Sequence, residues 1–347
     1  MLHTRSFSHA ETYFSELKAG KKTAGSLLQK ALRSRKIDSL SVTEFIECLL
    51  NTKQTQIFAE SSVLGEGSDW NQTELAILGD LSMAMDVEVF DNALHHAPKV
   101  HSSPLKALLI YTPGALLRNE TGNIPADWAE VTDNKHINYG AYYGLYERRL
   151  LPCLLHANES ALAQGLKTLI TLPGLGCGQF AGKFKGQLGA MLKQVLLDLL
   201  TKYAAQLPAV RAIYYDPFDE CDNERFEFEH ISLLVRPLLK GNEGKGQLCR
   251  PADYEDIKGE FRDCSLSSLV AWDHVSWPGN DFYIGSRATD DGVKAAATST
   301  MAVMSSYTGQ YNIDSNTYQA PDGYPTWDNV VSRNNISLIC HTNLKVY

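Results

Sequence analysis

The chain has 347 residues, a formal net charge of −8 at pH 7, 44% hydrophobic residues and 21% charged residues. These values suit one large α/β unit with additions and supply enough apolar surface for a sizeable core. The acidic balance and the lack of a basic stripe argue against nucleic acid as the main partner. No apolar run forms a signal-peptide core or reaches transmembrane length, so we expect neither a secretory signal nor a membrane partner.

The predicted elements begin with short helices over residues 8–56, where Ser41 and Glu44 form a capping box. Another helix is expected from Glu74 to Met85. From residue 86, apolar strands alternate with amphipathic helices. Strands are predicted over 106–111, 167–172, 210–215, 231–235 and 268–272, and helices over 139–156, 184–199 and 291–304. Strands separated by helices indicate a largely parallel sheet with helices on both faces.

A glycine-rich loop follows the predicted strand over 167–172, with Gly174, Gly176, Gly178 and Gly182 close together. An amphipathic helical pattern follows at once. Glycines let the backbone approach an anion, and a helix N-terminus offers unpaired N–H groups and a partial positive charge. The loop is therefore predicted to bind a phosphate group.

Other interpretations of this loop stay open. It is not a Walker A motif, because Gly182-Lys183 is followed by Phe184 instead of serine or threonine. A dinucleotide fingerprint over 176–181 is a weak match that keeps an NAD-dependent oxidoreductase as an alternative. The glycines could also serve only tight packing of strand and helix. Cys177 could be a nucleophile, although a small side chain under the loop is the favoured interpretation.

A second constellation, over residues 272–292, combines aspartates with aromatic residues. Asp290 or Asp291 would be an ordinary N-cap of the next helix, but Asp273 and Asp281 have no such explanation. Aromatic neighbours offer a stacking wall and raise a carboxylate's pKa by desolvation. Paired carboxylates are what cleavage of a glycosidic bond requires. Both loops follow strands, so we expect them at the same edge of the sheet.

Residues 173–182 resemble the diphosphate loop of macrodomains, which bind ADP-ribose, and residues 272–292 resemble a bacterial effector family of macrodomain-type hydrolases. That family removes ADP-ribose from an arginine of ubiquitin. The resemblance covers residues 105–310. It implies an α/β, macrodomain-like three-layer α/β/α sandwich over 86–347, with an N-terminal helical addition over 1–85. The Asn-Ala-Asn-Gly-Gly-Gly run of ordinary macrodomains is absent, as is the Gly-Gly-Gly signature of poly(ADP-ribose) glycohydrolases, so the acid must come from the aspartate loop.

The resemblance also implies roles for single residues. Asp281 and Asp291 would orient or deprotonate water and stabilise positive charge at the anomeric carbon, while Asp273 would position ribose or adenine or support the other two. Trp277 or Phe282 would wall the sugar pocket. The residues expected to bind ADP-ribose are Gly174, Gly176, Cys177, Gly178, Gln179, Phe180, Ala181, Gly182, Trp277, Asn280 and Phe282. No metal and no cofactor is implied.

The expected partner is ADP-ribose or an ADP-ribosylated protein, with ubiquitin as the first candidate. The seven widely spaced cysteines, without a CxxC pair, indicate reduced thiols in the cytosol, which for a secreted effector is the host cytosol. Two further alternatives remain: a reader that binds ADP-ribose without cleaving it, and a magnesium-dependent hydrolase with Asp290 and Asp291 as oxygen ligands.

Overall fold

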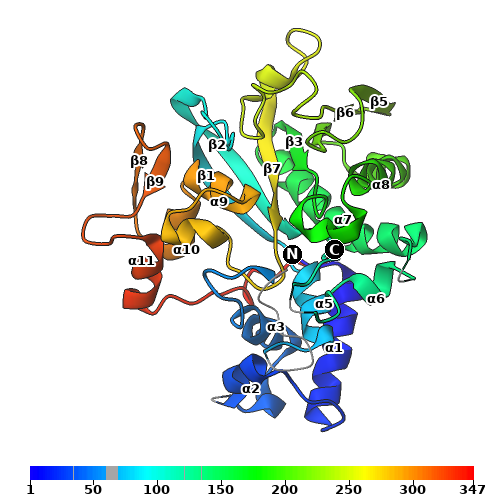
Figure 1. Cartoon of the computed structure of the whole chain (residues 1–347), viewed down its shortest axis with the longest axis vertical. Coiled ribbons are helices and arrows are strands. Elements are labelled where there is room, and N and C mark those ends of the chain that lie inside the picture. The colour runs from blue at the N-terminus through cyan, green and yellow to red at the C-terminus, as the bar shows by residue number, and fades with distance from the viewer. Residues whose placement is uncertain (34, 60–68, 121, 134) are drawn as a thin grey trace.

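The computed structural model describes residues 1–33, 35–59, 69–120, 122–133 and 135–347. A seven-stranded sheet in the order β1-β2-β7-β3-β4-β6-β5 forms its centre (Figure 1). The strands are β1 (Met83–Asp91), β2 (Val100–Pro113), β3 (Lys167–Pro173), β4 (Val210–Asp216), β5 (Glu224–Phe228), β6 (Ile231–Val235) and β7 (Cys264–Trp272). Strands β2, β7, β3, β4 and β6 run parallel, and β1 and β5 add antiparallel edges. The five predicted strands are confirmed.

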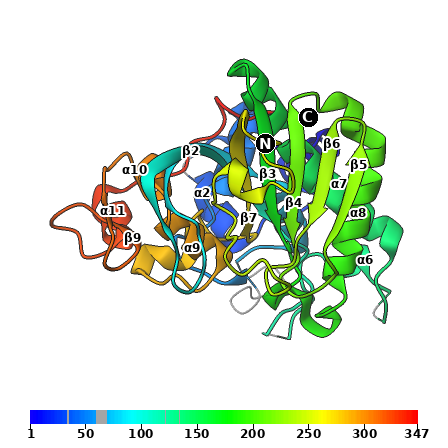
Figure 2. The ribbon, with the colours of Figure 1, turned by 90° about the horizontal axis from the view of Figure 1, so that it is seen from above.

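Alternate residues of the strands face opposite sides of the sheet, as the pleat requires. On one face, Leu108 and Ile110 lie in a core with α7 (Tyr139–Ala163) and α8 (Leu188–Tyr203). On the other face, Leu109 and Tyr111 share a core with Val293 of α9 (Asp290–Ala296). Figure 2 shows α7 and α8 together along β3 to β6, away from α9 and α10 (Thr300–Ser305). Helices on both faces confirm the α/β fold expected from the alternating pattern.

The N-terminal helices are α1 (Thr4–Lys18), α2 (Ser26–Arg33), α3 (Val42–Leu50) and α5 (Gln72–Asp80), grouped at one end of the molecule (Figure 1). The capping box of Ser41 and Glu44 at the start of α3 is confirmed. These helices share one hydrophobic core with later segments, including Trp277, Phe282 and Trp327 of α11 (Trp327–Asn334). The boundary expected between residues 85 and 86 falls inside β1, so a division there would cut a strand.

The remaining elements are short: α6 (Trp128–Val131), β8 (Gln310–Asn312), β9 (Thr317–Gln319), and the 3-10 helices η1 (Ile37–Ser39), η2 (Gln179–Phe184), η3 (Ala204–Gln206), η4 (Pro251–Tyr254) and η5 (Asn280–Ile284). The helix predicted over 184–199 begins later than expected. Phe184 belongs to the 3-10 helix η2, and the α-helix α8 begins at Leu188. None of the described helices combines the length and the apolar character that a membrane crossing demands.

Two other expected helices are corrected. The helix over 74–85 ends at Asp80, because the residues from Met83 onward alternate between buried and exposed positions and form β1. The helix over 291–304 is two helices, α9 and α10. The chain between them pairs with the edge of β1, where Phe90 N–H donates to the Ala297 carbonyl at 2.8 Å and Ser299 N–H donates to the Glu88 carbonyl at 2.9 Å. Pairing with a free strand edge thus overrides the helical pattern.

Candidate functional site

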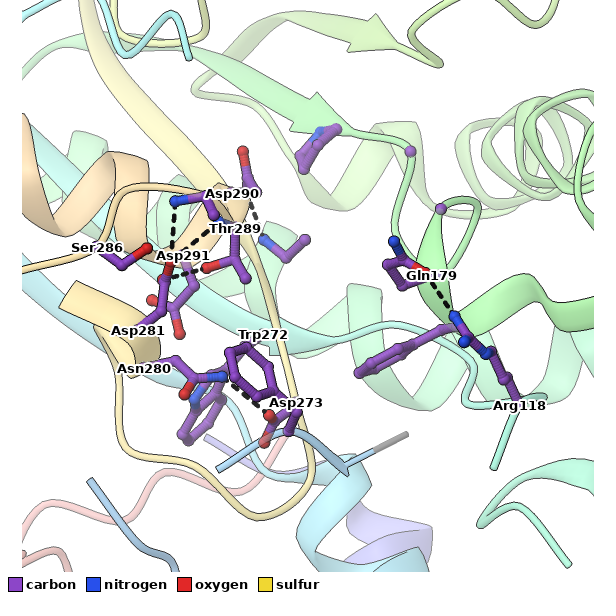
Figure 3. A pocket seen from close by; sticks show the side chains of 18 of the residues that line it. Arg118, Gln179, Trp272, Asp273, Asn280, Asp281, Ser286, Thr289, Asp290 and Asp291 are labelled. Atoms are coloured by element: carbon purple, nitrogen blue, oxygen red, sulfur yellow. Dashed lines mark hydrogen bonds between the residues drawn. The ribbon is translucent and has the colours of Figure 1, made fainter. Parts of the chain in front are cut away.

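A cavity of about 680 Å³ lies at the carboxyl ends of β3 and β7, which are parallel neighbours in the sheet. Both predicted loops line it. The glycine loop contributes Gly174, Gly176, Gly178, Gln179 and Phe180, and the acidic loop contributes Asp273, Asn280, Asp281, Asp290 and Asp291. Figure 3 shows the carboxylates facing Gln179 and Arg118 across the cavity. Two segments distant in sequence therefore meet in one site, as the sheet order requires.

The glycine loop is held close to the chain that follows β2. The hydroxyl of Tyr146 donates to the Leu175 carbonyl at 2.6 Å and accepts from the Ala115 amide at 3.1 Å. Gly176 has a φ of +73°, and a Cβ there would lie 2.7 Å from the Ala115 nitrogen. Only glycine fits this left-handed, crowded position without strain. At Gly178 a Cβ would meet nothing within 4 Å, so the cavity beside it is open to a ligand.

Arg118 lies at the glycine-loop side of the cavity and was missed by the sequence analysis. Its Nη1 donates to Oε1 of Gln179 at 2.5 Å, and its guanidinium also pairs with Glu120. Among the lining residues that the structure describes, Arg118 is the single cation. Its position just after β2 was the available signal, because β2 is a neighbour of β7 in the sheet. A cation beside a glycine loop suits an anionic ligand such as a diphosphate.

Asp281 and Asp273 both accept hydrogen bonds from the protein. Oδ2 of Asp281 accepts from the Ala288 amide at 2.8 Å, and Oδ1 accepts from the Thr289 hydroxyl at 2.6 Å. Oδ1 of Asp273 accepts from the amides of Val275 and Ser276 at 2.8 and 2.6 Å. These bonds fold the loops and orient each carboxylate toward the cavity wall.

Asp290 is also engaged, although it borders the cavity. Its Oδ2 accepts from the Ala271 amide at 2.8 Å and from Nζ of Lys294 at 3.0 Å. Lys294 is fully buried and also donates to the Leu269 carbonyl at 2.7 Å. The expectation that Asp290 or Asp291 caps α9 is wrong. The N-cap is Thr289, whose side chain accepts from the Gly292 amide. Asp290 instead accepts hydrogen bonds from the Ala271 amide of β7 and from Lys294.

Asp291 differs from the other three aspartates because one of its oxygens is buried without a partner in the described structure. It is 3% exposed, and its Oδ1 accepts from the Gly279 amide at 2.6 Å. Its Oδ2 is buried and makes no hydrogen bond within the described residues. Burial raises the pKa of Asp291 well above its usual range, and the nearby carboxylates add to the rise. A carboxyl group with a free oxygen and a raised pKa in a cavity is typical of a residue that exchanges protons.

Five of the expected binding residues do not line this cavity. Ala181 is buried against the α7–α8 core, and Gly182 lies beside Leu117 and Arg118. Trp277 and Phe282 belong to the core shared with the N-terminal helices, where Trp277 Nε1 donates to the Lys53 carbonyl at 3.0 Å. The wall expected from Trp277 or Phe282 is therefore supplied by other aromatic residues, namely Phe58, Phe180 and Trp272.

Cys177 is the fifth of these residues. It lines a neighbouring cavity of about 400 Å³, and its thiol donates to the Leu175 carbonyl. Burial raises the pKa of the Cys177 thiol well above its usual range. A protonated, buried thiol is a poor nucleophile, which favours the interpretation of Cys177 as a packing residue.

The acidic loop is also bound by a segment from the N-terminal region. The Gln54 amide donates to the Val275 carbonyl at 2.8 Å, and the Trp277 amide donates to the Gln54 carbonyl at 2.8 Å. The Ile57 amide donates to Oδ1 of Asn280 at 3.2 Å. Phe58 then reaches the cavity wall. Residues 54–58 therefore help to build a site that was expected from residues 173–292 alone.

The fold and this cavity define a macrodomain-class protein, and the comparison with known families agrees. A family model described as "Macrodomain effector MavL" matches residues 1–324. The chain belongs to this family of macrodomain effectors, which relates it to ADP-ribose. The match begins at residue 1 and so extends beyond the resemblance over 105–310 to the N-terminal helices. None of the curated proteins compared matches the chain.

Proposed function

We propose that the protein hydrolyses the N-glycosidic bond between ADP-ribose and an arginine side chain of a modified protein, with ubiquitin as the expected target. The observation that carries this proposal is that the glycine loop and Arg118 line one side of the cavity and the aspartates line the other. Gly174, Gly176 and Gly178 with Arg118 form the first side, and the aspartates form the second, acidic side. ADP-ribosylarginine has the matching charges, with a diphosphate at one end and a guanidinium at the other.

The acidic side favours arginine over a neutral linkage. Asp273, Asp281 and Asp290 surround Asp291, and their mutual repulsion is relieved by a cation. Both the substrate guanidinium and the oxocarbenium-like sugar in the transition state carry positive charge. The same carboxylates would therefore bind the leaving group and stabilise the developing charge at the anomeric carbon.

In this mechanism Asp291 acts on the attacking water through its unpaired Oδ2. The bond between the anomeric carbon and the guanidine nitrogen breaks, and the water oxygen bonds to that carbon. Asp291 takes the proton from water and returns it to the departing guanidine, so the carboxylate is regenerated. Asp281, held by Thr289, would orient the water, and Asp273 would hold the loop in position.

The proposed reaction needs no metal ion. Asp290 is a poor candidate for a magnesium ligand, because its Oδ2 already accepts from Ala271 and Lys294. Across the described part of the chain, no group of three or more His, Cys, Asp and Glu side chains is arranged to hold a metal. Turnover that persists in excess chelator would support this point, and turnover restored only by magnesium would contradict it.

The decisive experiment incubates the protein with arginine-ADP-ribosylated ubiquitin and measures released ADP-ribose by chromatography. Substrates with ADP-ribose on serine or glutamate provide the matched comparison. We expect release from the arginine linkage and a large loss of release with Asp291→Asn. Release from all linkages alike would contradict the role given to the acidic side, and full activity of Asp291→Asn would contradict its catalytic role.

A reader of ADP-ribose is the second candidate, and one observation favours it. Asp273, Asp281 and Asp290 all accept hydrogen bonds within the protein, as expected of carboxylates that shape a binding site. Calorimetric binding of free ADP-ribose without any release from modified ubiquitin would support the reader. The family description as an effector supports action in the cytosol of a host cell for either candidate.

A further inference from the structure

Lys53, which follows α3, is a buried lysine directly behind the cavity wall. It is 4% exposed, and its Nζ donates to the Asp273 carbonyl at 3.1 Å. The same Nζ lies 3.7 Å from the centroid of the Trp272 ring, a cation–π contact. In the described structure no ion pair joins Lys53 to a carboxylate. Lys294, by contrast, donates to three oxygens. Lys53 is therefore a buried ammonium with few partners, next to an acidic site.

The contacts of Lys53 join two residues that line the cavity. Trp272 supplies part of the aromatic wall, and Asp273 supplies a carboxylate. The backbone of Lys53 is fixed as well, because its carbonyl accepts from Nε1 of Trp277 at 3.0 Å. A displaced Lys53 would leave the Trp272 ring and the carbonyl of Asp273 without these contacts. Lys53 thus connects the N-terminal region to two residues that line the cavity.

The charge of Lys53 is coupled to the aspartates of the cavity. Burial lowers the pKa of Lys53 to about 7, and the carboxylates of Asp273 and Asp291 oppose that shift. Because electrostatic coupling is mutual, the ammonium favours the ionised form of Asp291. The other charged or titratable groups around Asp291 are Asp281, Asp290, Lys294, Tyr111 and Tyr283. The carboxylates among them oppose the ionisation of Asp291.

We propose that Lys53 is a positioning residue of this site: its buried ammonium lies between the Trp272 ring and the Asp273 carbonyl and holds both in place behind the aspartates of the cavity. This inference rests on the proposed hydrolase function. It predicts that removal of the Lys53 charge moves the acidic limb of turnover to higher pH, because a nearby cation favours the ionised form of Asp291. It also makes the N-terminal region a part of the catalytic unit.

The test compares Lys53→Met, which removes the charge, with Lys53→Arg, which stays protonated at all accessible pH values. Lys106→Met, on the exposed part of β2, serves as the matched control. We expect Lys53→Met to lower kcat about ten-fold and to move the acidic limb of the kcat profile to higher pH, with a smaller change in ADP-ribose affinity. Lys53→Arg, which keeps the charge, should restore both kcat and the position of the acidic limb.

The outcomes separate this inference from the proposed function. Wild-type protein that releases no ADP-ribose would overturn the hydrolase proposal and, with it, the role of Lys53. Active wild type with unchanged pH profiles in both variants would overturn the role of Lys53 alone. Should Lys53→Met fail to fold, as shown by circular dichroism, Lys53→Gln is the second neutral variant, and an acidic limb at the wild-type position in that variant contradicts the proposal.

Discussion

The Gly279 amide donates to Oδ1 of Asp291 at 2.6 Å, whereas Oδ2 of the same carboxylate is buried without a partner in the described structure. Gly279 has a φ of +102°, a conformation that side chains rarely adopt. The loop before η5 therefore supplies a donor to Oδ1 and none to Oδ2. Asp291 stands out from the other aspartates of the cavity by this single difference.

Replacing Asp291 by asparagine should abolish most activity and raise stability. Loss of the proton acceptor should lower kcat by about 100-fold or more. The pKa of Asp291 in the folded state lies above its ordinary value of 3.8, so its carboxyl group destabilises the fold increasingly as the pH rises from about 3.8 through the folded pKa. Asparagine removes this penalty. Melting temperatures of both proteins should therefore differ more at pH 8 than at pH 4, and an equal difference at both would contradict the assignment.

Gly292→Ala should disturb the site through Asp281. A Cβ at this position would lie 1.9 Å from Oδ1 of Asp281, so the carboxylate must leave Thr289. We expect a loss of about 1–3 kcal/mol in the free energy of unfolding and a fall in turnover. Gly144→Ala in α7 is the control, because a Cβ there meets nothing within 4 Å, and it should stabilise the protein by about 0.5–1 kcal/mol. Denaturant unfolding measures both, and equal effects would refute the steric argument.

Arg118→Ala should weaken the binding of ADP-ribose. The guanidinium is the single cation among the described lining residues, and a hydrogen bond to a charged group contributes about 1.5–3 kcal/mol. Titration calorimetry should show at least a ten-fold rise in Kd. Glu120→Gln is the matched variant, since Glu120 competes with a diphosphate for Arg118 and its neutralisation should not weaken binding. An unchanged Kd in Arg118→Ala would remove Arg118 from the diphosphate site.

Cys177→Ala should keep wild-type turnover. Burial raises the pKa of this thiol, so little thiolate forms near neutral pH, and the side chain does not line the main cavity. Alkylation followed by mass spectrometry should label Cys177 slowly in the native protein and rapidly in denaturant. Rapid labelling of Cys177 in the native protein, together with loss of turnover in Cys177→Ala, would support the alternative that Cys177 is a nucleophile.

Deletion of residues 1–85 should prevent folding of the remainder. The deletion removes the first residues of β1 and uncovers the core around Trp277, Phe282 and Trp327. We expect loss of the cooperative thermal transition, measured by circular dichroism. A truncated protein that melts cooperatively and retains ADP-ribose binding would show that the N-terminal helices are a separable addition, as the sequence analysis expected.

Local patterns in the sequence were sufficient for the five parallel strands and for the two loops of the site. Apolar β-branched runs define β3, β4 and β7, and glycines or aspartates directly after such runs fall at the carboxyl edge of a parallel sheet. Edge strand β1 was missed because it follows α5 closely and was assigned to the same helix. The break between α9 and α10 depends on pairing with β1, so no local pattern could predict it.

The sequence by itself thus determined the fold class and the two segments that meet at the cavity, because both follow from short-range periodicity and strand order. Only the tertiary structure decided which aspartate keeps a free oxygen, which aromatic residues face the cavity, and that Lys53 and Arg118 join them. Those properties depend on contacts between residues far apart in the chain, such as Lys53 with Trp272 and Asp273. Burial and hydrogen bonding, which set the chemistry of a carboxylate, arise from such contacts.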